Sequence, residues 1–192
     1  VIYTSDNGPW NQDKYTKKKK GHPEGSVFWG NAGPLRNGKG SPYEGGYRLP
    51  CIVRWPEKVP AGRTSDAIFA TIDFMPTFAT LAGYTVPGDR HIDGMDQTDL
   101  LLGKRETGRE HFYFQGAGIR VGKWKYLKPA SFFYGYAIED GREKVDELYD
   151  LNVDIGERNN LASTHPQKMA ELRELMMSVE GTDRLSPADN KR

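Results

Sequence analysis

The stretch VIYTSDNGP, residues 1–9, decides the fold class predicted for this chain. Its first four residues are β-branched or aromatic, which favours a strand covered on both faces, and Gly8-Pro9 ends that strand. Ligands of open α/β sheets lie beyond the carboxyl ends of strands, where Asp6 and Asn7 stand. If the chain turns at Gly8, their charged and neutral oxygens suit a hard cation such as Ca²⁺ or Mg²⁺. The alternative is that Asp-Asn-Gly only forms a turn and binds no ion.

A second stretch, LRNGKGSPYEGGYRLP at residues 35–50, places one lysine between two glycines. Glycine lets the backbone approach a ligand closely, so Lys39 lies on a loop suited to binding. Its ammonium would act as a point charge on a tetrahedral oxyanion such as sulfate or phosphate. The alternative for Lys39 taken alone is an exposed loop lysine.

The two stretches, in this order, resemble two motifs of the sulfatase family. Residues 4–9 look like the family's second metal-binding motif, and residues 38–50 look like its sulfate-binding lysine segment. Further segments match in family order, so that the resemblance runs to about Val179: residues 72–83, 93–103, 120–127 and 147–151. The resemblance implies an α/β fold. It would comprise the C-terminal part of an alkaline-phosphatase-like sulfatase core plus a small antiparallel sheet packed by a C-terminal helix.

The resemblance also implies a function, that of a metal-dependent, arylsulfatase-like sulfuric ester hydrolase. Asp6 and Asn7 would bind a divalent metal, with Ca²⁺ as the expected ion, and Lys39 would bind the substrate sulfate and take part in catalysis. The family's nucleophile is a formylglycine made within a Cys/Ser-x-Pro-x-Arg motif, which these 192 residues do not contain. Cys51, the one cysteine, is followed by Ile-Val-Arg and lacks the proline; it is predicted to be a small buried core residue.

The missing nucleophile leads to expectations about the whole protein. The chain opens inside a predicted core strand without Met, so we expect a piece of a longer sulfatase polypeptide, inactive by itself, with the nucleophile upstream. Two alternatives stay open: a non-catalytic fragment or scaffold that retains the fold, and a phosphate or phosphonate ester hydrolase of the same superfamily. Proteins of this family are often exported, which is the expectation for location.

The expected partners are a sulfated small molecule or sulfated carbohydrate and the remainder of the sulfatase polypeptide. Lys and Arg total 27 against 26 Asp and Glu, giving a net charge of +1, which does not favour a nucleic acid or an anionic membrane. No apolar stretch is long enough to span a bilayer.

Two domains are predicted: residues 1–108 as the C-terminal portion of the sulfatase α/β core, and residues 109–192 as a small α+β subdomain with a frayed tail. A helix should begin with Asp73 as N-cap and end at Gly83. Its spacing predicts one buried apolar face, made of Phe74, Met75, Phe78, Leu81 and Ala82.

The second predicted domain contains local signals of its own. A hairpin should turn at Gly122-Lys123, between short strands. Thr164 and Gln167 form a predicted capping box for a last helix with Pro166 in its first turn. The apolar stripe of that helix should pack on the sheet, and its members are Met169, Leu172, Leu175, Met176 and Val179.

Three weaker candidates concern the loops. The family resemblance makes residues 10–34 a border of the substrate cleft, so Trp10, His22 and Trp29 are possible substrate contacts, with packing as the alternative. The run at residues 17–20 is predicted to be a solvated lysine loop. An acidic stretch could suggest a second metal site, but its spacing fits no metal-ligand loop, and the family resemblance implies a structural crossing; its members are Asp89, His91, Asp93, Asp96 and Asp99.

Overall fold

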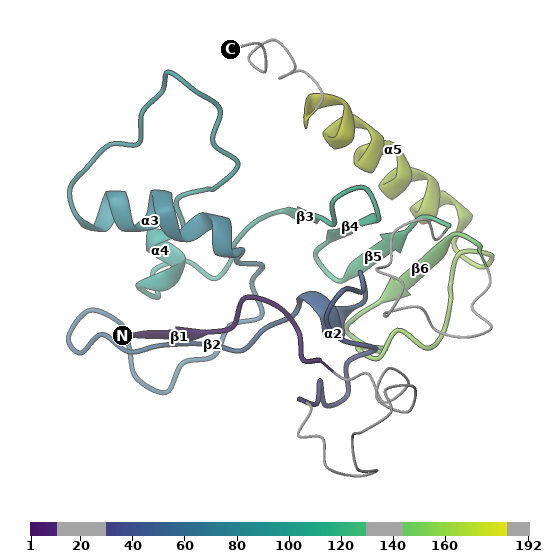
Figure 1. Ribbon diagram of the computed structural model, residues 1–192, viewed down its shortest axis with the longest axis horizontal. Coiled ribbons are helices and arrows are strands. Elements are labelled where there is room, and N and C mark those ends of the chain that lie inside the picture. Colours follow the sequence, from purple (N-terminus) through teal and green to yellow (C-terminus); the bar gives the residue numbers. More distant parts are fainter. Residues whose placement is uncertain (11–29, 130–143, 184–192) are drawn as a thin grey trace, which may run out of the picture. The chain divides into compact units, whose positions relative to one another are not determined.

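The computed structural model describes residues 1–10, 30–129 and 144–183 (Figure 1). The lysine run at 17–20, His22, Trp29 and the tail after residue 183 lie outside the described residues. The chain forms two compact units: a first unit of Val1–Asp6 with Pro50–Phe112, and a second unit of Asn7–Leu49 with Tyr113–Arg192. The predicted domain division at residues 108 and 109 stays a prediction.

The first unit contains a two-stranded sheet. Strand β1 (Ile2–Thr4) pairs antiparallel with β2 (Cys51–Val53), with Tyr3 opposite Ile52. The prediction that the first strand is buried on both faces is wrong in the described chain, because Tyr3 is 64% exposed and Ile52 62% exposed. The predicted core role of Cys51 is also wrong, since this residue is exposed. The physical reason is that two strands cannot by themselves bury both of their faces.

Helix α3 (Phe74–Leu81) follows the short 3₁₀ helix η1 (Thr71–Asp73) and ends where predicted. Gly83 takes a φ of +78°, and the N–H of Tyr84 returns to the carbonyl of Ala79 at 2.8 Å, a closing turn that favours glycine. The predicted apolar face is only partly buried in the described chain. Met75 is 51% exposed and Phe78 46% exposed.

Polar side chains occupy the buried side of α3. Thr77 is buried and its hydroxyl accepts the N–H of Gln97 at 3.0 Å, just before helix α4 (Thr98–Leu101). Asp73 stands at the N-cap position of α3, as predicted, but its side chain makes no capping hydrogen bond to that helix. Its carboxylate instead accepts the N–H of Ala70 at 2.9 Å. Part of the first unit is therefore organised around buried polar contacts.

The second unit contains a four-stranded sheet in the order β3-β4-β5-β6. Its strands are β3 (His111–Tyr113), β4 (Gly118–Val121), β5 (Trp124–Leu127) and β6 (Glu147–Asp150), and the division between units falls within β3. The predicted hairpin is confirmed, because Val121 pairs with Trp124 around Gly122, which has a φ of +54°.

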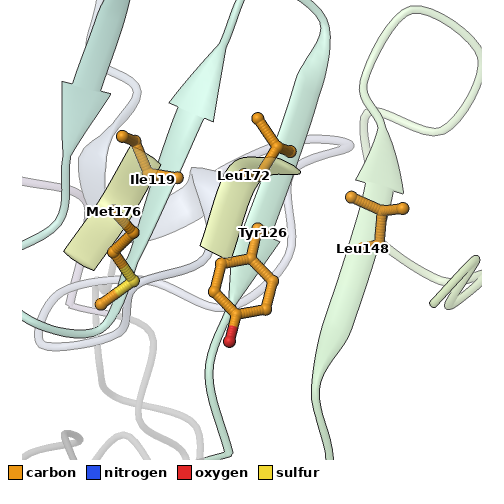
Figure 2. Close-up of a cluster of buried hydrophobic side chains, with 5 residues drawn as sticks. All are labelled: Ile119, Tyr126, Leu148, Leu172 and Met176. Carbon is orange, nitrogen blue, oxygen red and sulfur yellow. The ribbon is translucent and has the colours of Figure 1, made fainter. Parts of the chain in front are cut away.

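Helix α5 (Pro166–Asp183) covers one face of this sheet (Figure 1). The predicted stripe is confirmed: Leu172 and Met176 are buried against side chains of β4, β5 and β6 (Figure 2), namely Ile119, Tyr126 and Leu148. The helix begins at Pro166, while the Thr164 hydroxyl donates to the Leu161 carbonyl at 3.1 Å, unlike the predicted capping box. Within the described residues no helix combines the length and apolar character needed to cross a bilayer.

The opposite face of the sheet is covered as well. Side chains alternate along a strand, so Arg120, Lys125 and Tyr149, which lie in register, point away from α5. A second buried cluster on this face includes Tyr43, next to helix α2 (Glu44–Tyr47). The segment that carries Lys39 is thus continuous with the layer that covers this face of the sheet.

Candidate functional site

Residues 7–9 are here called the strap, and residues 35–50 the Lys39 segment. Two backbone hydrogen bonds join the strap to the Lys39 segment. The N–H of Gly8 donates to the carbonyl of Gly46 at 3.0 Å, and the N–H of Lys39 donates to the carbonyl of Pro9 at 2.9 Å. The two bonds hold the backbone that follows Asn7 beside the backbone of Lys39, within the second unit. Asp6, the residue before Asn7 in the chain, belongs to the first unit.

Glycines make this close approach of backbones possible. A Cβ on Gly8 would meet the carbonyl oxygen of Gly45, and one on Gly46 would meet the carbonyl oxygens of Ser41 and Gly38. A Cβ on Gly45 would likewise meet carbonyl oxygens on the segment before Lys39. These glycines serve contact between backbone segments, so any side chain here would force the strap and the Lys39 segment apart.

Lys39 lies in a tight turn formed by residues 38–41, here called the lysine turn. The N–H of Ser41 returns to the carbonyl of Gly38 at 3.2 Å, and Gly40 adopts a φ of +85°, which favours glycine. Asn37 precedes the turn with its side-chain oxygen on the N–H of Gly38 at 2.8 Å. The backbone on both sides of the half-buried Lys39 is therefore fixed.

The candidate metal ligands supply oxygen atoms only. Asp6 is exposed, and its Oδ1 lies 3.4 Å from the hydroxyl of Ser5, while Asn7 is half-buried. A carboxylate and an amide oxygen suit a hard cation, and such ions take six to eight oxygen ligands. Within the described residues no group of three His, Cys, Asp or Glu side chains could hold a metal ion. The pair therefore fits part of a coordination shell.

An ion cluster joins Glu44 of the Lys39 segment to the sheet and to a later loop; its other members are Lys125, Arg120 and Glu157. Lys125 Nζ is 2.9 Å from Glu44 Oε1 and 2.8 Å from Glu157 Oε1. Arg120 donates to Glu44 Oε2 at 3.1 Å, and the N–H of Glu44 donates to Glu157 Oε2 at 2.6 Å. Lys125 and Glu157 are 0% exposed and Glu44 is 2% exposed, so each charge depends on the others.

The two carboxylates of the ion cluster differ in their electrostatics. Burial raises the pKa of Glu44, but the positive charges of Lys125 and Arg120 outweigh it and hold that pKa below its ordinary value. Burial raises the pKa of Glu157 above its ordinary value, and the neighbouring charge of Glu44 adds to the rise. Lys125 favours the ionised form of both carboxylates, but only at Glu44, which Arg120 also contacts, do the positive charges outweigh the effect of burial on the pKa.

A second set of contacts, in addition to the ion cluster, joins the Lys39 segment to β6. The hydroxyls of Tyr43 and Tyr149 both donate to Glu147 Oε2, at 2.9 and 2.6 Å. Arg36 donates to the Tyr149 hydroxyl at 3.0 Å and to the Glu157 carbonyl at 2.7 Å, with its guanidinium 3.8 Å above the Tyr43 ring. The segment is thus tied down both before and after Lys39.

Sequence reasoning did not find the ion cluster. Lys125 stands between Trp124 and Tyr126, and alternation in a sheet with one solvated face would direct it to water. A usable signal was Glu44, a carboxylate within Tyr43-Glu44-Gly45-Gly46, because a charge among glycines and an aromatic residue needs a partner if it is buried.

Comparisons with known proteins agree with this architecture. A family model described as N-sulphoglucosamine sulphohydrolase, C-terminal, matches residues 38–181. The chain is 37% identical over 190 residues to N-acetylgalactosamine-6-O-sulfatase of Bacteroides thetaiotaomicron, covering 93% of this chain and 36% of that protein. The chain thus spans little more than a third of the length of this relative.

Solved structures show the same relationship. One, from work on glycosaminoglycan metabolism by Bacteroides thetaiotaomicron, has a TM-score of 0.75 at 37% identity and covers 94% of this chain and 38% of that chain. Another, solved in complex with its substrate D-glucosamine-2-N,6-O-disulfate, has a TM-score of 0.55 at 30% identity, with coverages of 78% and 31%.

The fold and the matched segments define the C-terminal part of an alkaline-phosphatase-like sulfatase, as the sequence predicted. The chain belongs to the sulfatase family, and its match is to the group described as N-sulphoglucosamine sulphohydrolase, C-terminal. The matched range begins at Gly38 and therefore includes Lys39.

Proposed function

We propose that this chain supplies metal-binding and sulfate-binding side chains to the active site of a sulfuric ester hydrolase. Asp6 and Asn7 would hold a divalent cation, for which their oxygen donors favour Ca²⁺, and Lys39 would bind the sulfate. The observation that carries the proposal is the pair of backbone bonds between the strap and the Lys39 segment. They support a common site for Asn7 and Lys39, which lie far apart in sequence.

The chemistry of sulfate ester cleavage requires such a site. Negative charge develops on the transferring group and on the leaving oxygen, and groups that are already in position stabilise it best. A bound cation would supply Lewis acidity. Lys39 would hold its ammonium against the sulfate without rearranging the backbone, because the lysine turn is closed by Ser41 and tied to Pro9. Asp6 and Asn7 would contribute one charged and one neutral oxygen.

The nucleophile would come from outside these residues. In this family a formylglycine supplies it, and we propose that the remainder of the sulfatase polypeptide carries it. A sulfated carbohydrate is the proposed substrate class. Support comes from the similar structure that holds a disulfated glucosamine and from the relative named for a sulfated N-acetylgalactosamine.

The experiment measures sulfate release from 6-O-sulfated hexosamines, and Ca²⁺ affinity by calorimetry, in the complete protein that contains this chain. Asp6→Ala removes a charged ligand and should weaken both Ca²⁺ binding and the rate. Asp66→Ala, at an exposed carboxylate in the same unit, is the matched control. Unchanged Ca²⁺ affinity in Asp6→Ala would reject the metal assignment, and faster cleavage of the matching phosphate esters would favour a phosphate ester hydrolase.

A further inference from the structure

Glu44 lies one residue before the contacts that hold the candidate site together. Gly45 donates its N–H to the carbonyl of Arg36 at 2.9 Å, in the segment that leads into the lysine turn. The carbonyl of Gly46 accepts the N–H of Gly8 in the strap at 3.0 Å. Because Gly45 and Gly46 follow Glu44 directly, the position of Glu44 determines where these two glycines contact the lysine turn and the strap.

We propose that the buried ion cluster is a positioning device for the active site. Through Glu44, it sets the spacing between the strap that carries Asn7 and the turn that carries Lys39. Lys125 on β5 is the central member, because its ammonium contacts both carboxylates. This inference rests on the proposed function, which gives that spacing its chemical purpose.

The contacts of Glu44 explain why the cluster is ionic. A buried ion pair adds little stability compared with well-packed apolar side chains, so stability alone does not account for it. Charged hydrogen bonds instead specify direction as well as distance. Glu44 is held at both carboxylate oxygens and at its N–H, by Lys125, Arg120 and Glu157. Held from three sides, the residue has little freedom to shift.

The path from Glu44 to the site contains little that could absorb a shift. Gly45 and Gly46 contact the carbonyls of the neighbouring segments directly, so backbone touches backbone. If Glu44 moves, Gly38 and Gly8 should therefore move by a similar distance. A misplacement of about 1 Å from a change away from the reacting atoms can cost on the order of 100-fold in rate.

The test is a double-mutant cycle between Glu44→Gln and Lys39→Ala in the complete protein, with kcat and KM measured for sulfate release. Glu44→Gln preserves shape and removes one charge, and Lys125 keeps Glu157 as a partner. We expect Glu44→Gln alone to lower kcat by about 10- to 100-fold. In the Lys39→Ala background it should add little, because the group being positioned is gone.

Asp150→Asn is the matched control, because it removes the negative charge that pairs with Lys123 at 2.6 Å, on a strand of the same sheet, without touching the Lys39 segment. It should leave kcat unchanged. If Glu44→Gln does not fold, Glu157→Gln replaces it in the cycle, since it retains the Lys125–Glu44 pair and alters the acceptor of the Glu44 N–H. Full kcat, or a loss that is additive with Lys39→Ala, overturns the inference. Full activity of Lys39→Ala alone overturns the proposed function, and the inference with it.

Discussion

The guanidinium of Arg109 and the carboxylate of Asp73 form a bidentate ion pair in the first unit, with Arg109 Nε 2.9 Å from Asp73 Oδ2. Asp73 is 0% exposed, and its oxygens also accept the N–H groups of Ala70 and Met95. One carboxylate therefore joins the start of α3 to two later segments of the chain. Asp73 thus stands at the predicted N-cap position, but its carboxylate binds these other groups and does not cap α3.

Asp73→Ala should destabilise the protein strongly. The change leaves the guanidinium of Arg109, whose side chain is 12% exposed, without its carboxylate and two N–H groups without their acceptor. Breaking a buried pair in this way costs about 3–5 kcal/mol of the free energy of unfolding. Urea unfolding of the complete protein measures the loss. Asp89→Ala, at an exposed pair with Arg90, is the control, and an equally small effect of both changes would contradict the prediction.

Local signals account for the elements that the sequence predicted well. Gly122 marks the hairpin and Gly83 the end of α3, because both turns need a positive φ. The apolar stripe of α5 also follows from spacing alone. Spacing says which residues share a face, however, and not which face is covered. Thr77 is therefore buried and Phe78 46% exposed, against the prediction for α3.

The sequence likewise predicts some parts of the candidate site and not others. The strap and the lysine turn could be found because each is a short contiguous motif. The pairing of Glu44 with Lys125 could not, because the two residues are 81 positions apart and meet only where a second layer covers the sheet. The alternation of polar and apolar residues along β5 predicts that Lys125 faces solvent, so the sequence of the strand does not indicate that Lys125 is buried.

Lys39→Ala should slow sulfate ester cleavage and leave the metal bound. Loss of one positioned charge-stabilising group costs about 2.7–4 kcal/mol in other hydrolases, a 100- to 1000-fold fall in kcat. The complete protein is assayed with a sulfated hexosamine, and its Ca²⁺ affinity is measured in parallel. Lys58→Ala, at an exposed lysine, is the control. Loss of Ca²⁺ affinity in Lys39→Ala would show that the residue supports the metal site rather than the sulfate.

The protein should lose stability at alkaline pH through Tyr149. Burial and the hydrogen bond to Glu147 raise the pKa of Tyr149 above its ordinary value. Because the folded form has the higher pKa, this contribution is fully present below about pH 10 and falls as the pH rises further. Unfolding free energies measured on both sides of that pH should show the decline. Tyr149→Phe should make the decline shallower, and an unchanged slope would count against the assignment.

The 192-residue chain by itself should not hydrolyse an aryl sulfate, because it contains no Cys/Ser-x-Pro-x-Arg motif from which formylglycine could form. The purified chain is incubated with an aryl sulfate and Ca²⁺, and product release is followed against a buffer blank. Turnover that is absent in Asp6→Ala would overturn the prediction, since it would require a nucleophile among these residues.

The isolated chain should self-associate through the β1–β2 sheet. Tyr3 and Ile52 are cross-strand partners, so their side chains share one face, and they are 64% and 62% exposed. Exposed apolar side chains on a short open sheet favour pairing between copies. Light scattering should therefore report oligomers or aggregates that grow with concentration.

A Tyr3→Lys/Ile52→Lys double variant tests whether this face is responsible, because lysines on an open sheet oppose association. It should shift the isolated chain toward monomer. Val153→Lys, at an 82% exposed residue of the second unit, is the matched control and should leave the association unchanged. A compact, monodisperse monomer of the unaltered chain would refute the prediction, whereas equal association of the chain and the double variant would move the contact to another surface.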